Sequence, residues 1–386
     1  MPIISTQPEL DALCLELAKH PYITIDTEFL RDKTYYPTLC LVQVAPPEGK
    51  AMAIDPLAKD LNLKPLLDLM DNPDVVKVFH AARQDLEIFY NLTGRVPQSI
   101  FDTQVAAMVC GYGDQIGYLN LVQDICNKKL DKGAQFTDWS RRPLTEKQTL
   151  YALDDVIWLR EVYKHLAQML KDRNRTAWVK EEMEFLTDPT TYQNPPDQAW
   201  QRLKLRTDKP QAIAVLMEVA KWREEEAQRR NVPRGRILRD ETLLDLAVHA
   251  PATVDELKHI RGVGEDIARG KLGVAIMAAV ERSLSIPKDS IPRPDKKRPL
   301  SQTLVPVVEL LKVLLRIVAA ENEVAARLIA SPDDLDEIAR SDDADVAPMK
   351  GWRFEVFGHE ALALKHGKVA LCIDGGTEIK RLPVKA

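Results

Sequence analysis

Near the N-terminus, the segment Tyr22–Glu28 (YITIDTE) is an apolar run that ends in two carboxylates, as expected of a buried strand with an acidic end. Residues i and i+2 of a strand lie on one face of the sheet, so Asp26 and Glu28 are predicted to point the same way. Two carboxylates this close repel each other, and burying either without a partner is costly. A divalent cation bound between them would remove both costs. A strand end with two solvated acids is the alternative, and the acids found downstream decide between the two.

The pattern after this strand predicts an α/β domain with a mixed sheet. A helix is expected within residues 1–20, where Leu10, Leu13 and Leu17 have helical spacing. Closely spaced strands then indicate an antiparallel meander, and strands that alternate with helices follow it. The further strands expected are Thr38–Ala45, Ala51–Asp55, Val75–Phe79 and Gln98–Phe101, and the further helices are Asn62–Met70, Ala82–Leu92, Thr103–Cys110 and several between Leu119 and about Glu184.

Two proline-rich breaks, at residues 187–197 and 286–299, separate this region from two helical blocks. The length of 386 residues predicts two or three domains. The helical blocks resemble each other, since Leu243–Ala247 (LLDLA) is echoed by Leu335–Ala339 (LDEIA). We interpret them as a diverged repeat, with chance similarity between short helical units as the alternative.

Composition excludes some classes of function. The net charge of −5 and the pI of about 5.9 exclude a uniformly basic nucleic-acid binder, although local basic patches remain possible. No run reaches the ~18 apolar residues that span a bilayer, and the N-terminus lacks a signal pattern, so a cytoplasmic protein without a membrane partner is expected. The five cysteines are scattered without zinc-site spacing and are expected to be reduced core residues.

Two further motifs place acids at the ends of regular elements. Asp85, in HAARQD, follows the strand ending at Phe79 and falls in the first turn of a helix, where an acid also suits the helix dipole. Tyr151 and Asp155 are four residues apart on a helix whose start is marked by Thr145–Gln148, so they share one face. An exposed Tyr–Asp pair is the structural alternative. With Asp26 and Glu28, these residues make an all-oxygen ligand set that favours Mg²⁺ or Mn²⁺ over zinc, and paired ions of this kind hydrolyse phosphodiesters.

These motifs, in this order, resemble the three exonuclease motifs of the DEDD superfamily: D-T-E, H-x-x-x-Q-D and Y-A-x-x-D, with the tyrosine typical of one branch. The flanking pieces TYYPTLCLVQVA and DWSRRPLT are similar to those of the ribonuclease D family. The resemblance implies an α/β fold, with a ribonuclease H-like mixed-sheet exonuclease domain at 1–190. It also implies two small all-α units, an HRDC domain at 207–284 and a second, degenerate HRDC-type helical domain at 301–386.

The same resemblance implies a 3′–5′ exoribonuclease that releases 5′-mononucleotides, trims tRNA precursors and other small structured RNAs, and uses two divalent cations. Asp26, Glu28 and Asp155 would hold one cation, and Asp26 and Asp85 the other. Tyr151 would orient the attacking water, a role that suits a phenol, whose pKa of ~10 makes it a poor base at neutral pH. A monomer is expected, because no long coiled-coil pattern or apolar stripe predicts an oligomer.

Five residues are expected to contact RNA. Thr27 and Phe29 flank the first two acids and are expected at the terminal nucleotide, with a place in the core as the alternative for Phe29. Arg142 is expected to meet phosphate, and Arg230 and Arg234 belong to a cationic run at 221–239 that would grip the RNA body. Solvated side chains are the alternative for all three arginines. The polar residues expected to have structural roles are His80, as a backbone hydrogen-bond partner, and Asp102, as a helix cap.

Two other functions fit part of the pattern. A DNA exonuclease of the same superfamily would use the same chemistry, but the sequence has no G-x-x-x-x-G-K-[ST] motor motif. A non-catalytic RNA-binding protein on a decayed nuclease fold is the other alternative. The complete set of four acids and a tyrosine argues against it.

Overall fold

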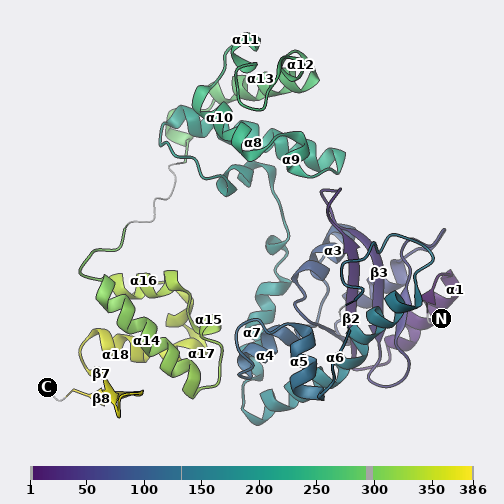
Figure 1. The fold of residues 1–386 in the computed structure, drawn as a ribbon, viewed down its shortest axis with the longest axis vertical. Coiled ribbons are helices and arrows are strands. Elements are labelled where there is room, and N and C mark those ends of the chain that lie inside the picture. Colours follow the sequence, from purple (N-terminus) through teal and green to yellow (C-terminus); the bar gives the residue numbers. More distant parts are fainter. Residues whose placement is uncertain (1–2, 132, 293–298, 385–386) are drawn as a thin grey trace.

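The computed structural model describes residues 3–131, 133–292 and 299–384. The chain forms a mixed α/β unit followed by two helical units (Figure 1). Each unit has its own hydrophobic core. The predicted break at 286–299 is described only in part, because residues 293–298 lie outside the described residues.

The α/β unit contains a six-stranded sheet in the order β1-β4-β3-β2-β5-β6. The first three long strands form the predicted antiparallel meander, and β5 and β6 run parallel to β2 beyond it. The strands are β1 (Ile3–Ile4), β2 (Tyr22–Leu30), β3 (Thr38–Ala45), β4 (Met52–Ile54), β5 (Val76–Phe79) and β6 (Ile100–Asp102). The mixed sheet is thus confirmed. The short β1 was not predicted, and it pairs in parallel with β4 at the edge of the sheet.

In the described part of this unit, seven helices cover the sheet: α1 (Gln7–Leu17), α2 (Lys64–Asp71), α3 (Arg83–Thr93), α4 (Thr103–Val109), α5 (Tyr118–Cys126), α6 (Glu146–Asp172) and α7 (Thr176–Thr187). The two faces of the sheet have separate cores. Ile23 and Ile25 of β2 pack with α1 and α3 in the larger core, whereas Leu41 of β3 packs with Ala152 and Val156 of α6 in the other. Because side chains alternate along a strand, the intervening β2 residues face α6.

A hydrogen bond connects β2 to α6. The buried hydroxyl of Thr24 donates to the backbone carbonyl of Val156 at 2.8 Å. Thr24 lies two residues before Asp26, and Val156 follows Asp155 directly. The bond therefore fixes the position of Asp155 along the face of β2. The predicted capping box between Thr145 and Gln148 is present and starts α6 one turn before Tyr151.

Each of the two helical units begins with a long, a short and a medium helix in that order, as the sequence repeat predicts. In the first unit these are α8 (Pro210–Arg230), α9 (Arg234–Ile237) and α10 (Asp240–His249), followed by α11 (Val254–Leu257), α12 (Glu265–Arg269) and α13 (Lys271–Leu284). In the second they are α14 (Val305–Glu321), α15 (Ala326–Ile329) and α16 (Pro332–Arg340), followed by α17 (Gly351–Arg353) and α18 (His359–Lys365). Short 3₁₀ helices lie at Pro189–Thr191, Pro196–Arg202, Lys288–Ser290 and Ala347–Met349, and a π-helix at Phe354–Gly358. No helix within the described ranges is both long and apolar enough to cross a membrane.

The expectation that helices fill the C-terminal block is wrong after Lys365. Strands β7 (Val369–Asp374) and β8 (Glu378–Pro383) form an antiparallel hairpin there. Gly375 and Gly376 both have positive φ, which a tight hairpin turn of this kind requires. The D-G-G-T sequence at this turn was a readable hairpin signal.

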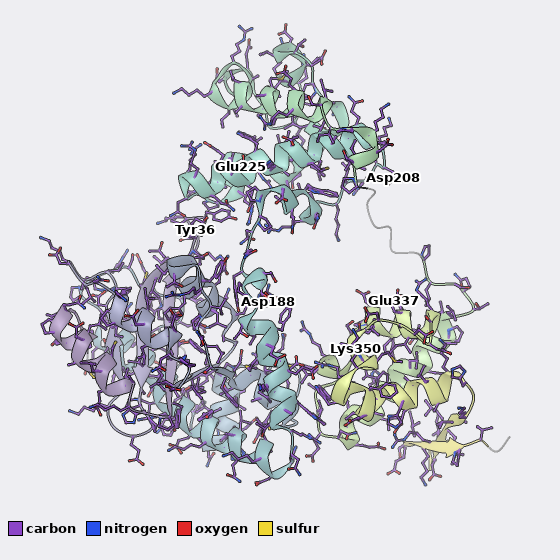
Figure 2. All side chains as sticks on the ribbon, turned by 180° about the vertical axis from the view of Figure 1, so that it is seen from behind. Tyr36, Asp188, Asp208, Glu225, Glu337 and Lys350 are labelled. Carbon is purple, nitrogen blue, oxygen red and sulfur yellow. The ribbon has the colours of Figure 1, made fainter. Side chains whose placement is uncertain are left out.

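The first helical unit docks on the loop that follows β2. The side-chain oxygen of Asn231 accepts the backbone N–H groups of Tyr35 and Tyr36, each at 3.1 Å. Tyr35 also donates its hydroxyl to the buried Glu224, and the guanidinium of Arg234 lies 4.8 Å from the Tyr35 ring centre. Figure 2 shows Tyr36 at this junction.

The second helical unit docks on α7 through stacked indoles. The rings of Trp178 and Trp352 lie 4.3 Å apart and nearly parallel. Beside them Arg353 pairs with Glu181 at 2.6 Å and also with Glu182. Both helical units are therefore fixed on the α/β unit by specific side chains.

Arg142 binds within the protein. Its guanidinium donates twice to Asp55, at 2.7 and 2.6 Å, and three more times to backbone carbonyls, so all five N–H donors are used. These bonds hold the loop before α6 against β3 and β4. They leave no donor for phosphate and do not support the RNA contact expected of Arg142.

Replacing Arg142 by alanine should lower the free energy of unfolding by about 3 kcal/mol, because Asp55, whose side chain is only 11% exposed, loses its cation. Urea denaturation followed by tryptophan fluorescence measures this change. Arg141→Ala is the matched control: that side chain is 84% exposed and pairs only with Asp138, so its loss should cost less than about 0.5 kcal/mol. Equal losses in the two variants would contradict the role given to Arg142.

Candidate active site

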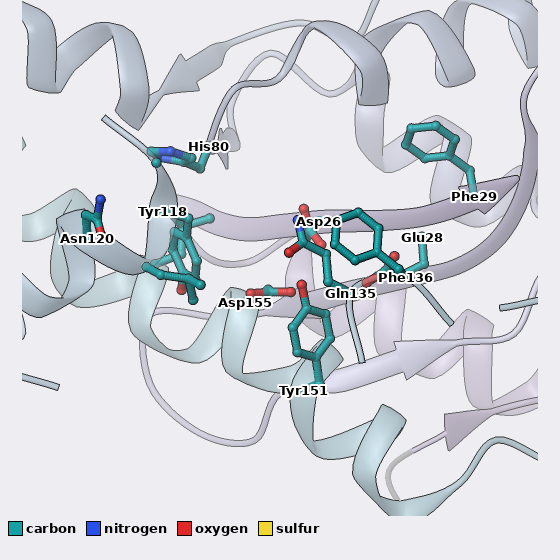
Figure 3. A pocket seen from close by; sticks show the side chains of 13 residues that line it. Asp26, Glu28, Phe29, His80, Tyr118, Asn120, Gln135, Phe136, Tyr151 and Asp155 are labelled. Atoms are coloured by element: carbon teal, nitrogen blue, oxygen red, sulfur yellow. The ribbon is translucent and has the colours of Figure 1, made fainter. Parts of the chain in front are cut away.

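Three of the predicted acids meet in a pocket of about 510 Å³ between β2 and α6. Asp26 and Glu28 come from β2, and Asp155 comes from α6. One carboxylate oxygen from each lies within 4.8 Å of the others (Figure 3). The i, i+2 spacing on the strand and the Thr24–Val156 hydrogen bond together produce this arrangement.

Asp85 lies beside this cluster, in the first turn of α3 as predicted. Its carboxylate is outside the three-acid group, but its charge raises the pKa of Glu28. Thr27 is buried, and its hydroxyl donates to the carboxylate of Asp85. The structure thus gives Thr27 the role of orienting Asp85, in place of the expected contact with the terminal nucleotide.

Asp102 and His80 fix the start of α3. Asp102 caps α4 by accepting the N–H of Gln104 at 2.8 Å, which confirms its predicted role. It also accepts the N–H groups of Ala81 and Ala82, at 2.9 and 2.8 Å, just before α3. His80 lies 3.1 Å from the carbonyl of Ile116, the expected backbone contact. Burial lowers the pKa of His80, so the ring is neutral near pH 7.

The electrostatics of the cluster favour a bound cation. Burial, followed by the charge of Asp155, raises the pKa of Asp26 well above its usual range. Burial and the neighbouring acids raise the pKa of Glu28 to about 10, and burial with Asp154 raises that of Asp155 to about 7. Among the described residues, no lysine or arginine forms an ion pair with any of these acids. Buried carboxylates without a cationic partner fit a divalent metal ion, which would hold them in the charged form.

Tyr151 reaches the same pocket from α6, one turn before Asp155. Burial, and then the charges of Asp155, Glu28 and Asp26, raise the pKa of its phenol. The phenol is therefore neutral at physiological pH, where it can donate a hydrogen bond but cannot serve as a base. Figure 3 shows its hydroxyl directed toward the acids.

Several pocket residues were missed by the motif analysis. Phe29 lines the pocket as expected, although it also packs against the main core. The missed residues are Tyr118, Asn120, Gln135 and Phe136. They lie near the start of α5 and on the loop between α5 and α6, where neither spacing nor charge pointed to a site.

The two arginines of α8 and α9 differ in their surroundings. The guanidinium of Arg230 lies 3.7 Å from the carboxylate of Glu226. The Arg230 side chain is nevertheless exposed, so it stays accessible to solvent. Arg234 donates to Glu224 at 2.5 and 2.6 Å and covers the ring of Tyr35. Arg234 thus serves the contact between units, and the RNA contact expected of it is not supported.

Replacing Asp26 by asparagine should stabilise the metal-free protein, because it removes a carboxyl group that burial and the neighbouring Asp155 make costly to ionise. We expect the melting temperature in EDTA to rise by about 2–4 °C and the further rise on adding Mg²⁺ to disappear. Asp154→Asn is the control, since Asp154 neighbours Asp155 but lies outside the cluster. A wild-type Mg²⁺ response in Asp26→Asn would argue against a metal site here.

Comparison with known proteins agrees with this geometry. Residues 1–171 match the family described as 3′–5′ exonuclease, and residues 213–280 match the HRDC domain. Ribonuclease D of Nitrobacter hamburgensis is 50% identical, with 98% of this chain and 99% of the relative covered. Ribonuclease D of Gluconacetobacter diazotrophicus is 47% identical, with 99% and 96% covered.

A solved structure shares the whole architecture. The crystal structure of Escherichia coli RNase D, described as an exoribonuclease involved in structured RNA processing, is 28% identical and has a TM-score of 0.80. The match covers 95% of this chain and 98% of that chain. Exonucleases with this fold depend on metal ions, which agrees with the acidic cluster in the pocket. The chain belongs to the ribonuclease D family of 3′–5′ exoribonucleases.

Proposed function

We propose that this exoribonuclease uses two divalent cations, Mg²⁺ or Mn²⁺, and trims the 3′ tails of tRNA precursors and other small structured RNAs. The observation that carries the proposal is the group of three partly buried carboxylates whose oxygens lie within 4.8 Å of one another, with Asp85 beside them and no cationic side chain paired to them in the described chain. Oxygen-only ligand sets of this kind suit hard cations.

The proposed ligands are Asp26, Glu28 and Asp155 for one ion, and Asp26 and Asp85 for the other. When bound, such ions acidify the attacking water and stabilise the departing 3′ oxygen. The remaining work falls to the protein. Tyr151 donates a hydrogen bond that orients the water, and its raised pKa keeps the proton in place. The hydroxyl of Thr27 donates to Asp85 and so restricts the orientation of that carboxylate, which would be a ligand of the second ion.

The proposed division of the chain is an exonuclease domain at 1–190, an HRDC domain at 207–284 and a second HRDC-type domain at 301–386. Three separate cores and the repeated order of helices support it. We propose that the helical domains hold the RNA body while the 3′ end enters the pocket. Arg230 supports this proposal, because it adjoins Asn231 at the contact with the loop after β2.

The substrates proposed here follow the description of Escherichia coli RNase D as an enzyme of structured RNA processing. Action on such RNAs suits a cytoplasmic monomer, and both properties belong to the proposal. The DNA-exonuclease alternative is less favoured, because the relatives that cover nearly the whole chain are ribonucleases.

Asp26→Asn and Asp155→Asn should each abolish hydrolysis of a 3′-tailed RNA in Mg²⁺, because each removes a charged ligand from the cluster, while RNA binding largely persists. Tyr151→Phe should slow hydrolysis less, by roughly 10- to 100-fold, because the lost hydroxyl only positions water. Digestion of labelled RNA and a matched DNA, with binding measured in EDTA, provides the readouts.

The control for these variants is again Asp154→Asn, which should cleave at close to the wild-type rate. Undiminished turnover in either acid variant would remove the ligand assignment. A loss in Tyr151→Phe as large as in the acid variants would mean that the phenol does more than orient water.

A further inference from the structure

The loop between α5 and α6 places an exposed aromatic ring at the active site. Phe136 is 94% exposed, more than any other large apolar side chain in the described residues. It nevertheless lines the pocket that holds Asp26, Asp155 and Tyr151. Figure 3 shows the ring at this pocket, close to the acids. A phenyl ring so placed is covered neither by the core nor by a neighbouring element.

The backbone around Phe136 is anchored on both sides. Ala134 and Trp139 are 1% and 2% exposed, and both belong to the core under α6. The N–H of Thr137 donates to the carbonyl of Ala134 at 3.2 Å, which closes a turn with Phe136 inside it. The amide of Gln148 donates to the hydroxyl of Thr137 at 3.1 Å. The ring thus projects from a fixed turn.

This anchoring connects the loop to the catalytic helix. Gln148 is the residue whose side chain completes the capping box of α6, and Tyr151 follows three residues later. The Trp139 ring centre also lies 6.1 Å from that of Tyr151. The same helix start therefore positions the ring of Phe136 and the phenol of Tyr151 relative to each other.

A phenyl ring has no hydrogen-bonding group, so it can recognise only a flat or apolar partner. Phosphate offers no such surface and ribose offers only a few C–H groups, whereas every base has a flat π-face. Phe29, the other phenyl ring of the pocket, is partly used in core packing, so Phe136 has more free area to offer. The volume of this pocket, about 510 Å³, is within the ~300–1,000 Å³ typical of sites that bind small molecules.

We propose that Phe136 stacks on a base of one of the last two nucleotides of the RNA, the two joined by the bond that is cut. The proposal rests on the proposed function for the position of the 3′ end. The contact contributes to binding and does not depend on which base is present. It increases the affinity for 3′ ends that carry unpaired, unstacked bases.

The test compares Phe136→Ala with the wild-type full chain on short single-stranded RNAs. For an unmodified RNA we expect KM to rise about tenfold, within the ~5- to 150-fold that one base–aromatic stack contributes, with kcat changed less than about twofold. Two abasic RNAs are then compared, one lacking the base at the last position and one at the position before it. On the RNA that lacks the stacked base, Phe136→Ala and the wild type should have equal KM. An RNA that lacks a base five positions from the end should still show the difference.

Binding in EDTA gives a readout that does not require cleavage. An RNA with 2-aminopurine at the position identified by the abasic series should lose fluorescence on binding the wild type, and less on binding Phe136→Ala. Phe136→Trp should retain the wild-type behaviour in both experiments. The matched control is Phe185→Ala, because Phe185 is a 64% exposed phenylalanine on α7 that does not line the pocket.

Three results would overturn the proposal: an unchanged KM in Phe136→Ala, an equal loss on every abasic RNA, or an equal loss in Phe185→Ala. Failure of the proposed function would look different. In that case the wild type would release no mononucleotides from any RNA in Mg²⁺ or Mn²⁺, whatever residue stands at position 136.

Discussion

The free-energy cost of placing three partly buried carboxylates side by side is the constraint on which the active site depends. Asp26, Glu28 and Asp155 lie close together in a pocket where burial raises the pKa of each. Within the described residues no lysine or arginine pairs with them. The arrangement therefore costs folding free energy in the absence of a cation, and the rest of the α/β unit has to maintain it.

Small buried contacts maintain this arrangement. The Thr24–Val156 bond sets α6 against β2, and the bond from Thr27 orients Asp85. Asp102 fixes the backbone at the start of α3, from which Asp85 projects. Each contact involves a polar group that the fold buries and satisfies, which gives such contacts well-defined geometry. The site is thus held by polar contacts at the ends of its elements as well as by its hydrophobic core.

Much of this could be predicted from the sequence, because several signals were local. The strand ending in Asp26 and Glu28, the capping box of α6 and the acid in the first turn of α3 all follow from spacing along one element. The mixed sheet followed from the order of strands and helices, and the family followed from the order of the motifs.

What could not be predicted depends on contacts between distant segments. Arg142 binds Asp55 and Arg234 binds Tyr35, and both partners are far away in the chain, so neither contact could be read from local sequence. Phe136 lies on an irregular loop, where periodicity carries no information. The hairpin after Lys365 was missed for another reason, since the resemblance to a helical repeat concealed its D-G-G-T turn.

We propose that Asp26 is shared by two cation sites and that Asp85 is needed for only one of them. Titration of Mn²⁺ into the full chain, followed by calorimetry, measures the number of bound ions. We expect two bound ions per chain in the wild type, one in Asp85→Asn and none at comparable affinity in Asp26→Asn. Two ions in Asp26→Asn, or an equal loss from both variants, would show that Asp26 is not shared.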